Sequence, residues 1–207
     1  MTKDHHAINR KDSSPYEEKC AEIRQKARTL FQKYGVKKTT VEEIATACNL
    51  SKTALYYYYK GKEEILAAVM RDESEALIAK MRAAAASAPD SRAELRAILK
   101  TRVCNVSELV IKILDDAASG IYEVYPSIST IRDQHLAEET KLIDRVLRNG
   151  YRRGVFREIR TPNTSMLMMA ALLGIDFYMA GNDNRQSLET SIDELLDLIF
   201  DGLCVRD

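Results

Sequence analysis

The sequence predicts an all-α protein, and three observations lead to this fold class. Only eight glycines and four prolines occur in 207 residues, which suits long uninterrupted helices. Apolar residues recur mainly at intervals of three and four, the spacing of a helix that buries one face. Neither the alternating pattern of a strand nor a hairpin turn stands out. We therefore expect a small N-terminal helical domain followed by a C-terminal helical bundle.

The first predicted helix follows a polar tail, residues 1–13. Ser14 is the expected N-cap, Pro15 suits the first helical position, and Glu17 completes a capping box. Gly35 is a natural stop after the helix. Between these signals, apolar residues follow at helical spacing: Ile23, Ala27, Leu30, Phe31 and Tyr34.

Two short helices joined by a tight turn are predicted next. Thr40 and Glu43 form a second capping box, which opens a helix with one apolar face. Asn49 is one of the few non-glycine residues that tolerate the left-handed backbone conformation. Ser51 then caps a third helix, which Gly61 ends. This arrangement is the helix-turn-helix pattern.

The third helix carries an unusual concentration of aromatic and basic residues. Leu55 and Tyr59 are expected to face inward, because they lie four residues apart on one side. The opposite side carries Lys52, Thr53, Tyr56 and Tyr57. Their hydroxyl and ammonium groups are suited to phosphate oxygens and base edges. The alternative is that all four tyrosines, 56–59, form the core and rim of a small bundle; we expect this for Tyr59 but not for Tyr57.

Charge is distributed unevenly along a chain whose formal net charge is zero. Residues 1–62 hold 13 basic and 7 acidic residues, a net charge of +6, whereas residues 63–207 carry a net charge of −6. Lys62 adds positive charge at the start of the next helix, where free N–H groups also favour a phosphate. This asymmetry indicates a segment that binds a polyanion, joined to a second part with another function.

Residues 23–69 resemble the DNA-binding domain of the TetR family of bacterial transcriptional regulators. The resemblance is carried by three segments: ARTLFQKYGVKKTTVEEIA, ACNLS and SKTALYYYYKGKEEIL. In that family, the triplet matched by residues 55–57 and the Lys-Glu pair matched by residues 62–63 are nearly a signature. The resemblance implies a cytoplasmic regulator, expected to be a repressor, that binds a palindromic double-stranded operator as a homodimer and is released by a small-molecule effector.

The resemblance also implies roles for individual positions in DNA binding. Phosphate contacts are implied for Tyr57 and Lys62, with help from Thr40, and base contacts for Lys52, Thr53 and Tyr56. The predicted DNA-binding set is Thr40, Ser51, Lys52, Thr53, Ala54, Tyr56, Tyr57 and Lys62. Asn49 and Thr53 stand where the family often has glycine, and Tyr58 where it often has histidine. These departures leave the operator sequence open.

Residues 63–207 are predicted to form the C-terminal domain, after the tail of residues 1–13 and a DNA-binding domain of residues 14–62. Helices are expected at residues 62–87, 91–118, 128–153, 166–179 and 191–203, separated by proline and glycine. The resemblance implies an effector cavity in this bundle, for a ligand that is at least partly apolar. Candidate lining residues, each of which also suits plain core, are Cys104, Ile113, Tyr122, Tyr125, Met169 and Phe177.

The segment from Met166 to Ile175, MLMMAALLGI, is apolar on every side of a helix. It is shorter than the about 20 residues that span a membrane, so one face must pack on its own domain and the other on a partner. The last helix has a similar excess of apolar residues. We predict a four-helix dimer interface, with a fully intramolecular core as the alternative. The expected interface residues are Met168, Leu172, Ile175, Leu195, Leu196 and Ile199.

The sequence predicts no catalytic site, metal site or cofactor. The four cysteines are far apart and form no CxxC pair, so reduced thiols are expected. His135, with Asp133, Glu138 and Glu139 nearby, is expected on a solvated helix face. An enzyme and a structural helical bundle are the alternative classes. The first lacks a recognisable catalytic set, and the second leaves the tyrosine and lysine surface unexplained.

Overall fold

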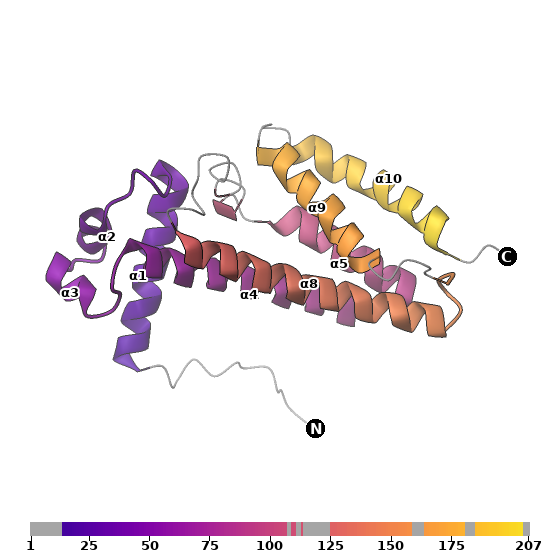
Figure 1. The fold of residues 1–207 in the computed structure, drawn as a ribbon, viewed down its shortest axis with the longest axis horizontal. Coiled ribbons are helices and arrows are strands. Elements are labelled where there is room, and N and C mark those ends of the chain that lie inside the picture. The colour runs from indigo at the N-terminus through magenta and orange to yellow at the C-terminus, as the bar shows by residue number, and fades with distance from the viewer. Residues whose placement is uncertain are drawn as a thin grey trace, which may run out of the picture. The chain divides into compact units, whose positions relative to one another are not determined.

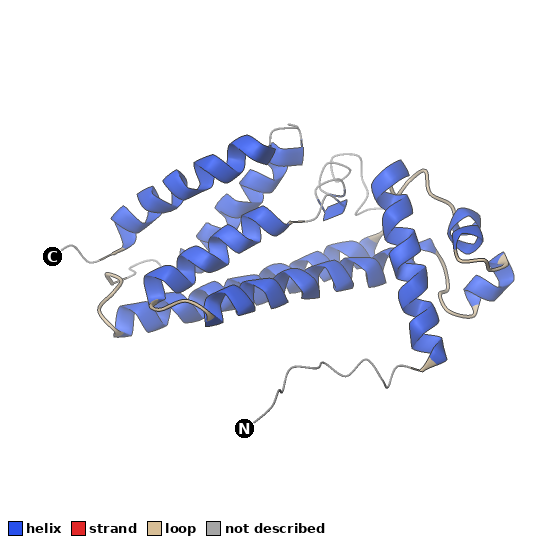
Figure 2. Ribbon diagram, turned by 180° about the vertical axis from the view of Figure 1, so that it is seen from behind, coloured by secondary structure: helices blue, strands red, loops and turns tan. Residues whose placement is uncertain are grey.

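The computed structural model describes residues 14–106, 109–110, 113, 125–158, 164–180 and 185–204. The regular secondary structure in these ranges is helical (Figure 2), which confirms the predicted all-α class. Phe156 and Cys204 form an isolated β-bridge. None of the helices in the described ranges is long and apolar enough to cross a membrane. The chain divides into two compact units between Val69 and Met70, inside helix α4 (Lys62–Ala86), and not after residue 62 as predicted.

The N-terminal unit contains α1 (Pro15–Tyr34), α2 (Val41–Ala47), α3 (Lys52–Tyr56) and the start of α4 (Figure 1). Both predicted capping boxes are present. Ser14 Oγ accepts a hydrogen bond from the backbone N–H of Glu17, and the Glu17 carboxylate accepts one from the Ser14 N–H. Thr40 and Glu43 make the same reciprocal pair at the start of α2. Each pair satisfies two backbone donors that a helix start leaves free.

The turn between α2 and α3 has the predicted geometry. Asn49 adopts a positive φ of 54°, and the Leu50 N–H donates to the Ala45 carbonyl at 2.9 Å. Ser51 Oγ accepts a hydrogen bond from the Ala54 N–H at 3.0 Å and so caps α3. Because α2 also contacts α3 directly, α2 fixes the orientation of α3.

The C-terminal unit comprises the remainder of α4 with α5 (Ser91–Asn105), α8 (Pro126–Arg152), α9 (Thr164–Ala180) and α10 (Arg185–Leu203). Helix α5 contacts α8, α9 and α10, and α8 contacts α9. Helices α4 and α8 run side by side in both views (Figures 1 and 2). One apolar cluster joins all five helices, and its largest buried members include Met81, Leu95, Ile98, Ile143, Phe156, Leu172, Leu196 and Phe200.

Three predicted helix boundaries differ from the structure. Helix α3 ends at Tyr56, before the predicted stop at Gly61. Helix α5 ends at Asn105, well before residue 118, because Val106 adopts an extended conformation with φ −60° and ψ 127°. The last helix begins at Arg185, before the expected start at residue 191. The other helices begin and end within a few residues of their predicted limits.

Gly150 allows the chain to fold back closely at the end of α8. A Cβ atom at this position would lie 2.1 Å from Cδ2 of Phe156, whose ring is buried in the apolar cluster. The Val155 and Phe156 N–H groups both donate to the Gly150 carbonyl, at 2.9 and 3.3 Å, which holds the two segments together. No side chain fits between them.

We expect Gly150→Ala to lower the free energy of unfolding by about 1–3 kcal/mol, because the phenyl ring and the helix must move apart. Gly202→Ala is the control, since no atom lies within 4 Å of its Cβ position and alanine favours a helix by about 0.5–1 kcal/mol over glycine. Denaturant unfolding measures both variants. Equal stability of the two would contradict this account of the packing.

Candidate nucleic-acid interface and cavity

Helix α3 presents the predicted polar surface to solvent. Tyr57 is 73% exposed and Tyr56 is 45% exposed. Leu55 and Tyr59 are buried, at 0% and 7% exposure, which confirms their predicted inward direction. The other predicted DNA-binding residues on this stretch are Ser51, Lys52 and Thr53, which are exposed, and Ala54, which is partly buried. The structure therefore brings these residues together on one accessible surface.

Tyr59 fastens the end of α3 to α1. Its hydroxyl donates to the Cys20 carbonyl at 3.3 Å and accepts a hydrogen bond from Arg24 Nη1 at 3.2 Å. Burial raises the pKa of Tyr59, so the phenol stays neutral. Since α3 has only five residues, these contacts and the burial of Leu55 supply the rigidity that so short a helix lacks.

Three tyrosines form an aromatic cluster beside α3. The rings of Tyr16 and Tyr58 stack with centroids 5.2 Å apart. The ring of Tyr57 lies edge-on to both, at 5.7 Å from Tyr16 and 5.2 Å from Tyr58. This arrangement restrains the most exposed tyrosine of the surface. Tyr16 was not among the predicted site residues, because nothing in the sequence indicates which side of α1 lies next to α3.

Lys62 is used differently from the expected phosphate contact. Its ammonium donates to the carbonyl oxygens of Val36 and Thr39, both at 2.9 Å, and to that of Lys37 at 3.4 Å. These carbonyls lie in the segment between α1 and α2, close to the N-terminus of α2. The geometry therefore gives Lys62 a positioning role in this segment, and a phosphate contact would require the ammonium to leave these carbonyls.

Lys52 at the start of α3 pairs with Glu42 of α2. The two side chains form a hydrogen-bonded ion pair on the surface. The hydrogen bond from Lys52 holds the pKa of Glu42 below its usual range, and the same bond raises the pKa of Lys52. Lys52 thus remains charged and is held at the exposed end of α3.

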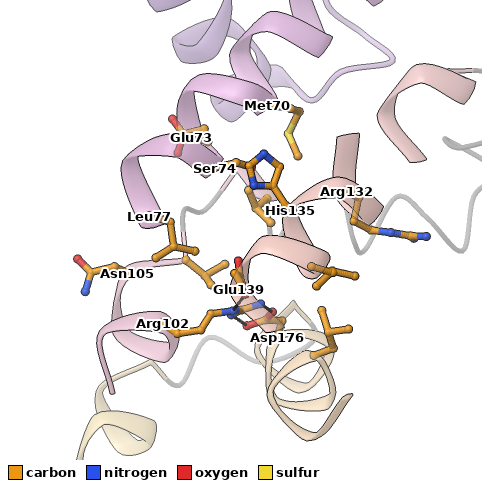
Figure 3. A pocket seen from close by; sticks show the side chains of 14 residues that line it. Met70, Glu73, Ser74, Leu77, Arg102, Asn105, Arg132, His135, Glu139 and Asp176 are labelled. Atoms are coloured by element: carbon orange, nitrogen blue, oxygen red, sulfur yellow. Dashed lines mark hydrogen bonds and ion pairs between the residues drawn. The ribbon is translucent and has the colours of Figure 1, made fainter. Parts of the chain in front are cut away.

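A cavity lies within the C-terminal unit, between α4, α5, α8 and α9 (Figure 3). Its described lining residues are Met70, Glu73, Ser74, Leu77, Arg102, Asn105, Val106, Val110, Arg132, His135, Leu136, Glu139, Leu173 and Asp176. All of them belong to the same unit of the chain. None of the described lining residues therefore comes from α1, α2 or α3.

A buried charge network lies at one end of the cavity. Arg102 of α5 donates through Nη1 and Nη2 to the two carboxylate oxygens of Asp176 of α9, at 3.0 and 2.6 Å. Its Nε donates to Oε2 of Glu139 of α8 at 2.7 Å. All three side chains are at most 6% exposed. The network thus connects three helices through one guanidinium group.

His135 and Glu139 correct a prediction, because neither lies on a fully solvated face. Both line the cavity one helical turn apart on α8, with Glu139 buried and His135 partly buried. Burial lowers the pKa of His135 and raises the pKa of Glu139. One indication of the third partner of the network was present in the sequence, since Asp176 is the only acidic or basic residue in the apolar stretch 166–179.

Comparison with known proteins identifies the N-terminal unit. Residues 23–69 match the family described as bacterial regulatory proteins, tetR family. The HTH-type transcriptional repressor KstR2 of Rhodococcus jostii (strain RHA1) is 27% identical over 200 residues, which cover 93% of this chain and 94% of the relative. The chain therefore carries the DNA-binding domain of the TetR family in residues 23–69. It is accordingly a DNA-binding transcriptional regulator, in agreement with the exposed surface of α3.

Solved structures with the same fold cover nearly all of the chain. The fatty acid degradation regulator FadR from Bacillus halodurans superposes with a TM-score of 0.75 at 18% identity, covering 95% of this chain and 100% of the other. The ketosteroid transcriptional regulator KstR2 of Mycobacterium tuberculosis gives a TM-score of 0.63 at 19% identity, covering 97% of this chain and 100% of the other. The C-terminal unit therefore has the fold of these regulators although its sequence has diverged.

The described lining of the cavity contains none of the predicted residues. Met169 belongs to the apolar cluster of the unit, and Ile113 is buried. Cys104 and Tyr125 are partly buried, and neither is among the described lining residues. The remaining two candidates, Tyr122 and the side chain of Phe177, lie outside the described residues. The sequence predicted a cavity in the right unit but could not predict which helix faces surround it.

The predicted dimer residues differ in how accessible they are on the single chain. Leu172 and Leu196 are 5% and 1% exposed and pack in the core of their own unit. Met168, Ile175 and Ile199 are partly buried against the same core, and Leu195 is 39% exposed. Among the described side chains of α9 and α10, the large apolar ones that are exposed are Met166, Leu167, Leu195 and Leu198, at 62%, 59%, 39% and 70%. Each helix buries one apolar face inside its unit, and the sequence did not show which face that is.

The role of Lys62 can be tested with Lys60 as the control. Lys60 is exposed, and its replacement by methionine removes the same charge. We expect Lys62→Met to destabilise the N-terminal unit by about 1–3 kcal/mol, because two partly buried carbonyls lose their donor. Lys60→Met should change stability by less than about 0.5 kcal/mol. Thermal unfolding, with hydrogen exchange at residues 36–40, measures the difference. An unchanged stability of Lys62→Met would show that the ammonium does not hold this segment.

Proposed function

We propose that this TetR-family regulator is a repressor that binds a palindromic operator as a homodimer and is released by a small-molecule effector. The observation that carries the proposal is the surface of α3, where a lysine, a threonine and two tyrosines are exposed on a helix whose other side is buried. Exposed aromatic residues beside basic residues on a helix-turn-helix are suited to the major groove. The family is one of transcriptional regulators and not of enzymes.

Each part of this surface is assigned a role in DNA binding. Lys52 and Thr53 lie in the first turn of α3, the end of a recognition helix that contacts base edges. Tyr57, which follows the helix and is restrained by its neighbouring rings, is assigned to a phosphate. Thr40 and Ser51 use their hydroxyl groups to cap α2 and α3, so their part is to fix the helix starts beside the backbone.

The proposed dimer uses the outer faces of α9 and α10. Four large apolar side chains are exposed there, and burying such a patch against a second copy removes it from water. Two heads related by a two-fold axis would then read half-sites about 34–36 Å apart, one helical turn of DNA. Selection of DNA fragments from a random pool tests this directly, and a bound motif without two-fold symmetry would contradict it.

Helix α4 supports the proposed coupling between effector and operator. Its 25 residues span about 38 Å at 1.5 Å per residue. The helix crosses the boundary between the two units, and its residues 70–77 contribute to the lining of the cavity. A ligand that displaces this part of α4 therefore acts on a helix whose first turn carries Lys62.

Substitutions in α3 should separate affinity from specificity. We expect Tyr57→Phe to weaken binding to all sequences about tenfold, because a phosphate contact carries no base information. Lys52→Ala and Thr53→Ala should instead change which bases are preferred. Fluorescence anisotropy and selection from a random pool measure the two effects. If both alanine variants select the wild-type motif, the assignment of the base-contacting residues is wrong.

The dimer is tested by a charge on the exposed face of α10. We expect Leu198→Asp to weaken dimerisation about a hundredfold or more, because each copy would bury an unpaired carboxylate in the interface. Tyr151→Asp is the control, since Tyr151 is 49% exposed on α8 and lies outside the proposed interface. Light scattering at a range of concentrations measures the oligomeric state. Dimers of equal stability in both variants would place the interface elsewhere.

A further inference from the structure

We propose that the cavity of the C-terminal unit binds a small amphipathic cation, with its ammonium group on the Glu139 carboxylate and its apolar body along α4, α8 and α9. The inference rests on the proposed function, because it names the chemical class of the effector. It is derived from the buried charges, the polar atoms without partners and the apolar wall of this cavity.

The first argument is the charge balance of the buried network. Two carboxylates, those of Glu139 and Asp176, share the single guanidinium of Arg102. When both are ionised, the network carries a net charge of about −1 in a site shielded from water, which is unfavourable without a compensating cation. Burial accordingly raises the pKa of Glu139 despite the opposing attraction of Arg102. A ligand cation beside Glu139 would compensate this charge.

The second argument is that two polar atoms at this end of the cavity lack partners. Arg102 occupies Oε2 of Glu139, and no hydrogen bond from the described residues reaches Oε1. Nδ1 of His135 is likewise buried without a hydrogen-bond partner among the described residues. Figure 3 shows the His135 ring and the Glu139 carboxyl group on the same side of α8. An ammonium group supplies donors for both a carboxylate oxygen and a neutral imidazole nitrogen.

The third argument is the composition of the remaining wall. Apolar side chains from α4, α8 and α9 adjoin the polar end, among them Met70, Leu77, Leu136 and Leu173. The empty volume, including the mouth open to solvent, is about 560 Å³. Methionine and leucine walls suit a flexible alkyl body.

An anionic ligand fits the same site poorly. Arg102 already donates to both carboxylates, so an incoming carboxylate would meet Glu139 and Asp176 before it reached a free guanidinium edge. Arg132, the other basic lining residue, extends away from His135 and Glu139 (Figure 3) and pairs with Asp133 at 2.9 Å. A neutral alcohol could donate one hydrogen bond but would leave the excess charge uncompensated.

The test uses three six-carbon probes with different head groups: hexylammonium, hexanol and hexanoate. Isothermal titration of the full-length protein should give an affinity for hexylammonium about tenfold or more above that for the other two. Glu139→Gln should abolish this preference, because the amide still accepts from Arg102 but carries no charge. Glu138→Gln is the matched control: it removes the same charge from a half-exposed neighbour that pairs with Lys141 outside the cavity, and should bind like wild type.

Three outcomes would overturn the proposal: hexanoate or hexanol binding as tightly as hexylammonium in the wild type, an unchanged hexylammonium affinity in Glu139→Gln, or an equal loss in both glutamine variants. The wild-type series decides the ligand class even if Glu139→Gln folds poorly. Binding of the selected DNA fragment without any probe tests the proposed function separately. If DNA binds and hexylammonium leaves its affinity unchanged, the effector role fails, because linkage requires a reciprocal effect.

Discussion

The DNA-binding surface depends on holding a five-residue helix in one orientation. A helix of that length is unstable alone, since nucleation costs more than a few hydrogen bonds return, so its position must come from its surroundings. Leu55 and Tyr59 bury one side of α3, the Tyr59 hydroxyl ties its end to α1, and Ser51 caps its start. Every exposed group on the other side is placed by these contacts. The tyrosines of this segment therefore have two roles. Tyr59 packs against α1, whereas Tyr56 and Tyr57 are exposed to solvent.

Most of the N-terminal unit could be predicted because its signals are local. Capping boxes, a left-handed Asn49 and a capping Ser51 are short-range features that a sequence shows directly, and the structure contains each of them. Lys62 could not be predicted in the same way. Its partners are carbonyls more than 20 residues earlier in the chain, and a lysine at a helix start looks the same whether it faces a phosphate or its own backbone.

The C-terminal unit was predictable as a set of helices but not as an arrangement of faces. Helix α9 is apolar all round, so its sequence does not show whether Leu172 or Leu167 faces the core; the structure buries the first and exposes the second. The network of Arg102, Glu139 and Asp176 joins residues 37 and 74 positions apart, a separation at which no pattern operates. Only the isolated carboxylate in an apolar helix, Asp176, hinted that a buried partner was needed.

The buried network contributes less to the stability of the bundle than apolar packing would, which suggests a functional reason for the charges beside the cavity. Replacing a buried ion cluster with well-packed apolar residues of similar volume often leaves a protein equally or more stable, and the apolar cluster beside it shows that this unit packs such residues well. A network with one more acid than base, next to a cavity and to a His135 Nδ1 that has no partner among the described residues, lowers the stability of the unit further. A cationic ligand that compensates this charge would remove the unfavourable electrostatic free energy of the network, and this gain would contribute to its binding. Binding and conformational response then have the same physical origin. The charged groups that the ligand would compensate connect α5, α8 and α9, and α4 lines the same cavity.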